Sequence, residues 1–308
     1  FWMGAFASAT NDIASDGMYL IALKPDQQSF FVGLRSTFYR VGMITGQGLI
    51  VIIAGNLEES LGDPTKAWSW TMIIVAGLML TLTLINFFAT PNVQEVRVKR
   101  EDQPSFGKVF GTFFTKKNIG ISLAFVLLYR LGESQLVKMA SPFFLDERTA
   151  GGLGLSVTDV GYLYGTLGVI SLLAGGIIGG IVISRDGLGK WMMPMAFAIN
   201  APNLGYVLLS WQQPDNFLFP AIVVIIEQLG YGFGFAAYMV FLIYLAEGLF
   251  KTAHYALATG FMAMGMMFPG MLSGYMQEWL GYPGFFVWVV LATIPSFVMA
   301  YVAKYPKE

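Results

Sequence analysis

The sequence is a succession of apolar stretches, each long enough to cross a lipid bilayer, with short polar segments between them. A membrane-spanning helix needs about 20 mostly apolar residues. Nine stretches reach about that length, at residues 1–23, 30–55, 67–89, 118–145, 158–183, 190–211, 217–246, 253–276 and 282–303. Within lipid, a helix satisfies its own backbone hydrogen bonds. The pattern therefore predicts an all-α polytopic membrane protein.

The composition agrees with lipid as the solvent and excludes several other classes of protein. Charged residues make up 12% of the chain and hydrophobic residues 56%, whereas a soluble domain carries about 25% charged residues. The net charge of −1 offers no basic surface, so we expect no nucleic-acid partner. The chain has no Cys and a single His, so we expect neither a metal site nor a cofactor.

Motifs for catalysis and for ATP hydrolysis are absent from the sequence. It has no Gly-rich phosphate loop ending in Gly-Lys-Ser or Gly-Lys-Thr, and neither Gly-x-Ser-x-Gly nor His-Glu-x-x-His. We therefore expect a secondary transporter rather than an enzyme or an ATP-driven pump.

The Lys and Arg residues fall almost entirely on one side of the predicted membrane. If the loop after the first span is cytoplasmic and the sides then alternate, the outer loops hold only 2 of the 18 basic residues, Lys66 and Arg148. Four more lie within spans, and the cytoplasmic segments hold 12. Cytoplasmic loops carry an excess of Lys and Arg. This bias predicts a multi-pass protein whose C-terminus is cytoplasmic.

The longest polar stretch, residues 91–117, divides the spans into three before it and six after it. Six spans after a basic cytoplasmic loop follow the two-halves plan of the major facilitator superfamily, in which each half has six helices. On that plan the spans are helices 4–12, and the chain, which begins inside an apolar run without an initiator Met, is expected to lack the first three. The predicted domains are a partial half at 1–91, a linker at 92–117 and a six-helix half at 118–308. Residues 106–114 fit either an amphipathic helix on the membrane surface or a flexible linker.

Several spans carry ionisable residues at the depth of the membrane. Such a residue costs about 2.5–3.5 kcal/mol on insertion scales, so it is a functional candidate by default. On the two-halves plan, helices 4, 7 and 10 line the central cavity, and three of the four spans that carry charges correspond to them. The candidates are Asp12 and Asp16 in the first span, Arg35 and Arg40 in the second, Arg130, Glu133 and Lys138 in the fourth and Glu227 in the seventh.

Depth along the helices suggests how these charges pair. Asp16 and Arg35 lie about ten residues from the turn between the first two spans, and Asp12 and Arg40 about fourteen, which at about 1.5 Å per residue places each pair at equal depth. We predict the pairs Asp16–Arg35 and Asp12–Arg40. They are either static ion pairs or, where an Asp exchanges protons, part of the transport mechanism.

The same reasoning assigns roles in the second half. Arg130 and Glu133 are three residues apart on one helix face and can pair. Glu133 and Glu227 are candidates to carry protons with Asp12 and Asp16. Candidates for binding substrate are Arg35, Arg40, Tyr129, Arg130, Lys138, Asn203 and Gln228. The competing interpretations are that Lys138 reaches the membrane interface, that Glu227 bonds a neighbouring helix, and that the aromatic and amide side chains only pack.

Glycine pairs four residues apart predict close contacts between helices. They are Gly42/Gly46, Gly161/Gly165, Gly175/Gly179, Gly176/Gly180 and Gly270/Gly274.

Three stretches resemble the AmpG-type permeases of the major facilitator superfamily. They are SATNDIASDGMYLIAL at 8–23, LLYRLGESQLVKMASPFFLDE at 127–147 with GLSVTDVGYLYGTLG at 154–168, and FKTAHYALATGFMAMGMMFPGMLSGYMQEWLGYPGFFVW at 250–288. The segment RDGLGK at 185–190 resembles the short basic loop between helices 8 and 9 of the superfamily.

The resemblance implies a fold of twelve helices in two pseudo-symmetric halves. It implies proton-coupled import of anhydromuropeptides that carry N-acetylglucosamine. Asp12 and Asp16 match the acidic motif of that family's helix 4, and Arg130 and Glu133 match its helix 7 cluster. The expected partners are a small glycopeptide substrate, protons and the lipid bilayer, and the expected location is the bacterial inner membrane, as a monomer.

Two other functions stay open. The acetyl-coenzyme A transporters of the endoplasmic reticulum are relatives of the same family, so the substrate is alternatively acetyl-coenzyme A or another organic anion. A different class with the same fold is a membrane receptor or scaffold that transports nothing, in which the buried acids would be permanently paired.

Overall fold

The computed structural model describes residues 2–24, 27–31, 38–39, 42, 50–90 and 105–303. Arg35 and Arg40, and with them both predicted Asp–Arg pairs, lie outside the described residues. All the regular structure in the described part is helical. The chain divides into two compact units, one made of Phe1–Ser36 and Val98–Glu308 and the other of Thr37–Arg97.

The smaller unit contains α3 (Ile50–Leu61) and α4 (Pro64–Ala89). The segment between the second and third predicted spans, residues 56–66, is mostly helical, because α3 continues to Leu61 and α4 begins three residues later. Glu58, Glu59 and the neighbouring Leu residues are good helix formers, so the acidic segment extends the helix. Asp63 caps α4, since its side chain accepts hydrogen bonds from the backbone N–H groups of Thr65 and Lys66.

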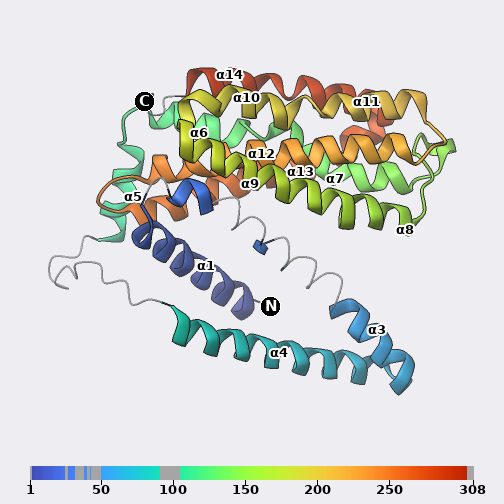
Figure 1. The fold of residues 1–308 in the computed structure, drawn as a ribbon, viewed down its shortest axis with the longest axis horizontal. Coiled ribbons are helices and arrows are strands. Elements are labelled where there is room, and N and C mark those ends of the chain that lie inside the picture. The colour runs from blue at the N-terminus through green and yellow to red at the C-terminus, as the bar shows by residue number, and fades with distance from the viewer. Residues whose placement is uncertain are drawn as a thin grey trace. The chain divides into compact units, whose positions relative to one another are not determined.

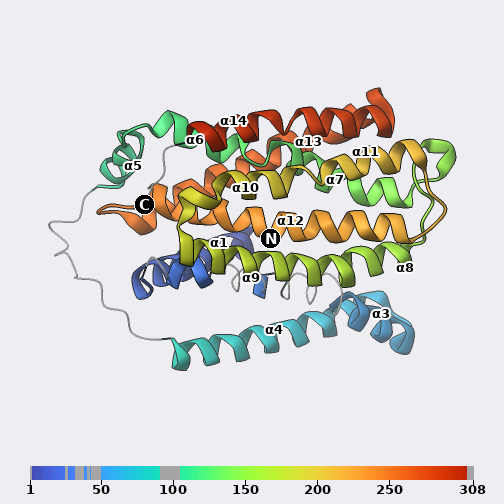
Figure 2. The same ribbon diagram turned by 45° about the horizontal axis from the view of Figure 1, so that its top comes forward.

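The larger unit contains α1 and the helices that follow the polar stretch, several of which run side by side (Figures 1 and 2). Their order is α1 (Trp2–Ala22), α5 (Phe106–Phe114), α6 (Ile119–Leu128), α7 (Leu131–Leu145), η3 (Arg148–Ala150), α8 (Val157–Val160), η4 (Gly161–Gly168), α9 (Val169–Asp186), α10 (Leu188–Asn200), α11 (Asn203–Gln212), α12 (Leu218–Ala246), α13 (Lys251–Leu291) and α14 (Ile294–Val302).

Within the described residues, six helices are long and apolar enough to cross a membrane. Five match predicted spans, and the sixth, Lys251–Val302, has 52 residues and covers the last two. At about 1.5 Å per residue it is twice as long as one crossing needs, and Gly281 interrupts it with a non-helical backbone at φ 64°. The first predicted span is the helix α1, which carries Asp12 and Asp16 and is not among the six.

Glycines bring α9 and α12 into close contact, as the spacing of Gly175/Gly179 predicts, whereas Gly180 of the pair Gly176/Gly180 faces Ser29 and Phe30. A side chain at Gly175 would overlap the carbonyl oxygen of Leu229, and one at Gly179 would lie 2.9 Å from the carbonyl oxygen of Phe233. By contrast, Gly161, Gly165 and Gly274 have nothing within 4 Å of such a position.

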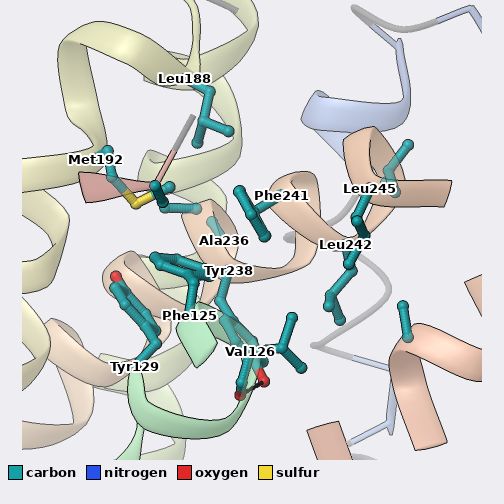
Figure 3. Packing of buried hydrophobic residues seen from close by; sticks show 14 of the residues in the cluster. Phe125, Val126, Tyr129, Leu188, Met192, Ala236, Tyr238, Phe241, Leu242 and Leu245 are labelled. Atoms are coloured by element: carbon teal, nitrogen blue, oxygen red, sulfur yellow. Dashed lines mark hydrogen bonds between the residues drawn. The ribbon is translucent and has the colours of Figure 1, made fainter. Parts of the chain in front are cut away.

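The buried apolar residues of the larger unit form two separate clusters. The first contains Phe125, Tyr129, Met192, Tyr238 and Phe241, part of which Figure 3 shows at close range. The second contains other aromatic residues, among them Phe143, Phe144, Tyr206, Tyr282 and Phe286. Each cluster draws on several helices, so each ties one end of the helices together.

The amphipathic helix α5 extends over Phe106–Phe114, the range predicted for it. It is held against the ends of two long helices: Phe113 is fully buried, and the Nε2 atom of His254 on α13 lies 3.2 Å from the Thr112 hydroxyl. Lys116, just after α5, donates to the carbonyl oxygens of Leu245 (2.5 Å) and Glu247 (2.7 Å), where α12 ends. Partial burial lowers the pKa of Lys116, and the nearby Glu247 carboxylate opposes that shift.

Candidate functional site

A layer of buried polar side chains separates the two apolar clusters. On the 118–145 span, Arg130 and Glu133 lie between Tyr129 of the first cluster and Leu136 of the second. Along α10–α11, α12 and α13–α14, buried polar side chains likewise lie between residues of the two apolar clusters. We call the set the polar layer, and its members, all buried, are Arg130, Glu133, Asn200, Asn203, Glu227, Gln228, Thr293 and Ser296.

Three helices are interrupted at this layer. α6 gives way to α7 at Tyr129–Arg130, α10 to α11 at Ala201–Pro202, and α13 to α14 at Ala292–Thr293. Figures 1 and 2 show α10 and α11 following each other along one line. Pro202 lacks a backbone N–H, and Arg130 has φ −110° and ψ 20°, outside the helical range. Interruptions in membrane helices are tolerated where other groups satisfy the freed backbone atoms.

A side chain of the polar layer satisfies one of these freed groups. The hydroxyl of Ser296 donates to the carbonyl oxygen of Tyr129 at 2.6 Å, and the Nδ2 atom of Asn200 donates to the Ser296 hydroxyl at 2.8 Å. Three interrupted helices are therefore joined by one short chain of hydrogen bonds.

Asn203, at the start of α11, differs from Asn200. It is 1% exposed, and neither atom of its amide has a hydrogen-bond partner within the described residues. It faces Gly132 on α7, where a side chain would come within 3.5 Å of its Nδ2 atom. An unpartnered buried amide costs free energy.

Arg130 and Glu133 form a buried ion pair, as their spacing predicts. The Nε atom of Arg130 lies 2.9 Å from Oε2 of Glu133, and one terminal nitrogen of Arg130 donates to the hydroxyl of Tyr231 at 2.8 Å. The guanidinium carbon lies 4.8 Å from the ring centre of Phe235 and 5.9 Å from that of Tyr238. The carboxylate and the aromatic faces together stabilise the buried cation.

Glu227 lies one helical turn before Tyr231 on α12 and is also buried. The Nε2 atom of Gln228 lies 3.1 and 2.8 Å from the two carboxylate oxygens of Glu227. The hydroxyl of Tyr206 on α11 donates to Oε2 of Glu227 at 3.4 Å. The bond from Glu227 to a neighbouring helix, which was the competing interpretation of this residue, is thus present, and a role in proton transfer stays a prediction.

The other predicted site residues lie in varied surroundings. Tyr129 is fully buried, and its hydroxyl donates to the carbonyl oxygen of Gly234 at 3.2 Å, so a sugar ring would reach it only if the helices separated. Lys138 is exposed, and its methylene groups run along Gly270 of α13. On α1, Asp16 is buried and Asp12 exposed. The transport roles of these residues stay predictions.

The structure adds residues that the sequence does not single out. Ser296 and Thr293 join the polar layer from the last helix, and Tyr164 and Tyr206 surround Glu227. Ser, Thr and Tyr are common in membrane helices, so no sequence signal marks them. Within the described residues, no group of three or more His, Cys, Asp and Glu side chains is arranged to hold a metal ion.

A bundle of apolar helices with a buried, charged polar layer defines a polytopic membrane protein of the transporter class. The sequence profile of the Major Facilitator Superfamily matches residues 1–274. The chain therefore belongs to the Major Facilitator Superfamily, whose members are transporters rather than enzymes.

Individual relatives indicate which transporters of the superfamily this chain is similar to. The anhydromuropeptide permease of Escherichia coli strain K12 is 24% identical over 304 residues, which cover 99% of this chain and 59% of that permease. The putative transporter AmpG 4 of Rickettsia conorii is 25% identical over 305 residues, covering 96% of this chain and 70% of that protein. The chain is thus similar to AmpG transporters along nearly all its length, and it spans 59% of the length of the first relative.

Proposed function

We propose that the protein is a proton-coupled secondary transporter that imports cell-wall-derived anhydromuropeptides across the bacterial inner membrane by alternating access. The observation that carries the proposal is the polar layer, in which two carboxylates, Glu133 and Glu227, are buried at mid-bundle. The similarity to an anhydromuropeptide permease supports the choice of substrate.

The two carboxylates have different surroundings, which suggests different roles. Glu133 neutralises Arg130 at 2.9 Å, so protonation of Glu133 would release the guanidinium to bind an acidic group of the substrate. Glu227 accepts hydrogen bonds from Gln228 and Tyr206 and lies one helical turn from Tyr231, the hydroxyl that Arg130 contacts. We assign Glu227 to proton binding and the Arg130–Glu133 pair to coupling proton binding with substrate binding.

The rival substrate, a large organic anion such as acetyl-coenzyme A, needs cationic side chains that are free to meet its phosphates. Arg130 is already paired with Glu133 and stacked on aromatic rings. Lys138 is the other described cation of this span. Arg35 and Arg40 lie outside the described residues, so both substrates stay open.

The test is uptake of labelled anhydromuropeptide into proteoliposomes that contain the full-length protein, with and without an inward proton gradient. We expect accumulation that depends on the gradient, and we expect Glu227→Gln to abolish accumulation while the protein stays in the membrane. If accumulation continues after the proton gradient is collapsed, transport is not coupled to protons. Transport of acetyl-coenzyme A in place of the glycopeptide would establish the rival substrate, and transport of neither would favour a receptor or scaffold.

A further inference from the structure

Two tyrosine hydroxyls lie in line with the carboxylate of Glu227. The hydroxyl of Tyr164, on η4, is 2.7 Å from that of Tyr206 on α11, and the Tyr206 hydroxyl is 3.4 Å from Oε2 of Glu227 on α12. Tyr164 is only partly buried, whereas Tyr206 and Glu227 are buried. The three groups therefore lead from the partly buried Tyr164 side chain to the buried carboxylate.

Aromatic rings enclose this line of hydroxyls. The ring centre of Phe144 lies 5.9 Å from those of both Tyr164 and Tyr206, and the ring of Phe286 lies 5.4 Å from that of Tyr206. Phe144 and Phe286 are fully buried and have no group that exchanges protons. Among these four side chains, the two tyrosine hydroxyls are the groups able to pass a proton.

The segment that carries Tyr164 has an unusual backbone. Residues Gly161–Gly168 form a π-helix, between the short α8 and the long α9. π-Helical turns are rare and occur frequently at functional sites. The wider turn changes which residues face the bundle, and here Tyr164 faces α11 while Tyr162, two residues earlier, is 60% exposed.

We infer that Tyr164 and Tyr206 form a proton relay through which Glu227 exchanges its proton with the solution. As a proton arrives at the Tyr164 oxygen, the Tyr164 hydroxyl proton moves to the Tyr206 oxygen, and the Tyr206 proton moves to Oε2 of Glu227. Both tyrosines end neutral and the carboxylate becomes a carboxylic acid. The inference rests on the proposed role of Glu227 as a proton-binding group.

Titratable groups from other elements lie close to Glu227. The titratable groups that face Glu227 from the neighbouring helices include Tyr206 of α11 and Tyr164 of η4. On α12 itself, Tyr231 follows one turn later and accepts a hydrogen bond from Arg130. The predicted orientation places the Tyr164 end of the line toward the outside, the side from which an importer takes its protons.

The test is infrared spectroscopy of the purified full chain in lipid after a rapid change of pH. The carboxylic-acid band that disappears in Glu227→Gln reports the protonation of Glu227. We expect Tyr206→Phe and Tyr164→Phe to slow the appearance of this band at least about tenfold, since a positioned acid–base group contributes at least that much to a proton transfer. Tyr162→Phe, on the same π-helix, is the matched control and should leave the rate unchanged.

The outcomes separate the relay from the proposed function. A wild-type rate in both Tyr206→Phe and Tyr164→Phe would overturn the relay, and so would equal slowing in Tyr162→Phe. If Glu227→Gln removes no band on any pH change, Glu227 does not titrate and the relay fails with it. The infrared signal needs no substrate, so it tests the relay alone. Proton-driven uptake measured on the same variants tests the transport function separately.

Discussion

At the scale of single residues, the polar layer shows how a few charged groups are tolerated inside an apolar bundle. Arg130 is bonded to Glu133 and Tyr231 and covered by aromatic rings. Removing one partner of a buried ion pair costs far more than replacing both, because a single charge is then left uncompensated. The Arg130–Glu133 pair therefore behaves as a unit.

Arg130→Met should lower the free energy of unfolding by about 3–5 kcal/mol, because Glu133 loses the cation that balances it. The double variant Arg130→Met/Glu133→Gln should recover most of that loss. Thermal or denaturant unfolding in detergent measures both. Equal stability of the single and double variants would show that the two side chains do not depend on each other.

Asn203 and Asn200 give opposite expectations for the same substitution. Asn203→Leu removes two buried amide atoms that have no partner within the described residues and should raise the free energy of unfolding by about 1–3 kcal/mol. Asn200→Leu removes hydrogen bonds to Ser296 and Ala196 and should lower it. A loss of stability in Asn203→Leu would mean that its amide has partners, such as buried water, that replace the missing bonds.

At the scale of helices, close approach depends on residues that have no side chain. α9 and α12 touch through glycines on both helices: a side chain at Gly232 of α12 would overlap the carbonyl oxygen of Leu172. In lipid, the hydrophobic effect does not drive helices together. Close packing of the two backbones at such glycine contacts therefore helps to hold the helices in contact.

Gly175→Ala should therefore destabilise the bundle by about 1–3 kcal/mol or more, since the added methyl group meets backbone rather than a movable side chain. Gly274→Ala is the matched control, because nothing lies within 4 Å of the added carbon, and its stability should be unchanged. Comparison of thermal unfolding in detergent tests the pair. A Gly175→Ala protein as stable as the control would contradict the close packing.

At the scale of the whole molecule, the turn after α1 meets the long helices near one end. The amine of Lys251 on α13 donates to the side-chain oxygen of Gln28 at 3.5 Å. A side chain at Gly17 would lie 2.7 Å from Thr252, and one at Gly180 of α9 would lie 2.9 Å from the carbonyl oxygen of Phe30. Alternating access requires the contacts at one end of a transporter to open during each cycle.

The 308 residues contain no Cys, so a pair of introduced Cys residues at this contact meets no other thiol within them. Joining Gln28→Cys to Lys251→Cys with a cleavable bifunctional thiol reagent should stop uptake, and cleavage of the reagent should restore it. Each single variant treated in the same way is the control. Full uptake by the cross-linked protein would show that this contact stays closed throughout transport.

The sequence by itself determined that the chain is an all-helical membrane protein, where most of its spans lie, and which side chains are charged within them. The lipid bilayer imposes these features on each segment separately. Each helix must form its own backbone hydrogen bonds and can bury only a few charges. The i,i+3 spacing of Arg130 and Glu133 was enough to predict their pairing for the same local reason.

Only the tertiary structure decided that three interrupted helices meet at one polar layer, that Tyr129 is enclosed, and that Tyr164 and Tyr206 lead to Glu227. These features join residues that are far apart along the chain, such as Tyr129 and Ser296. A Tyr or Ser in an apolar helix has the same local preferences whether it faces lipid or a buried carboxylate, so contacts between helices, not local pattern, set its role.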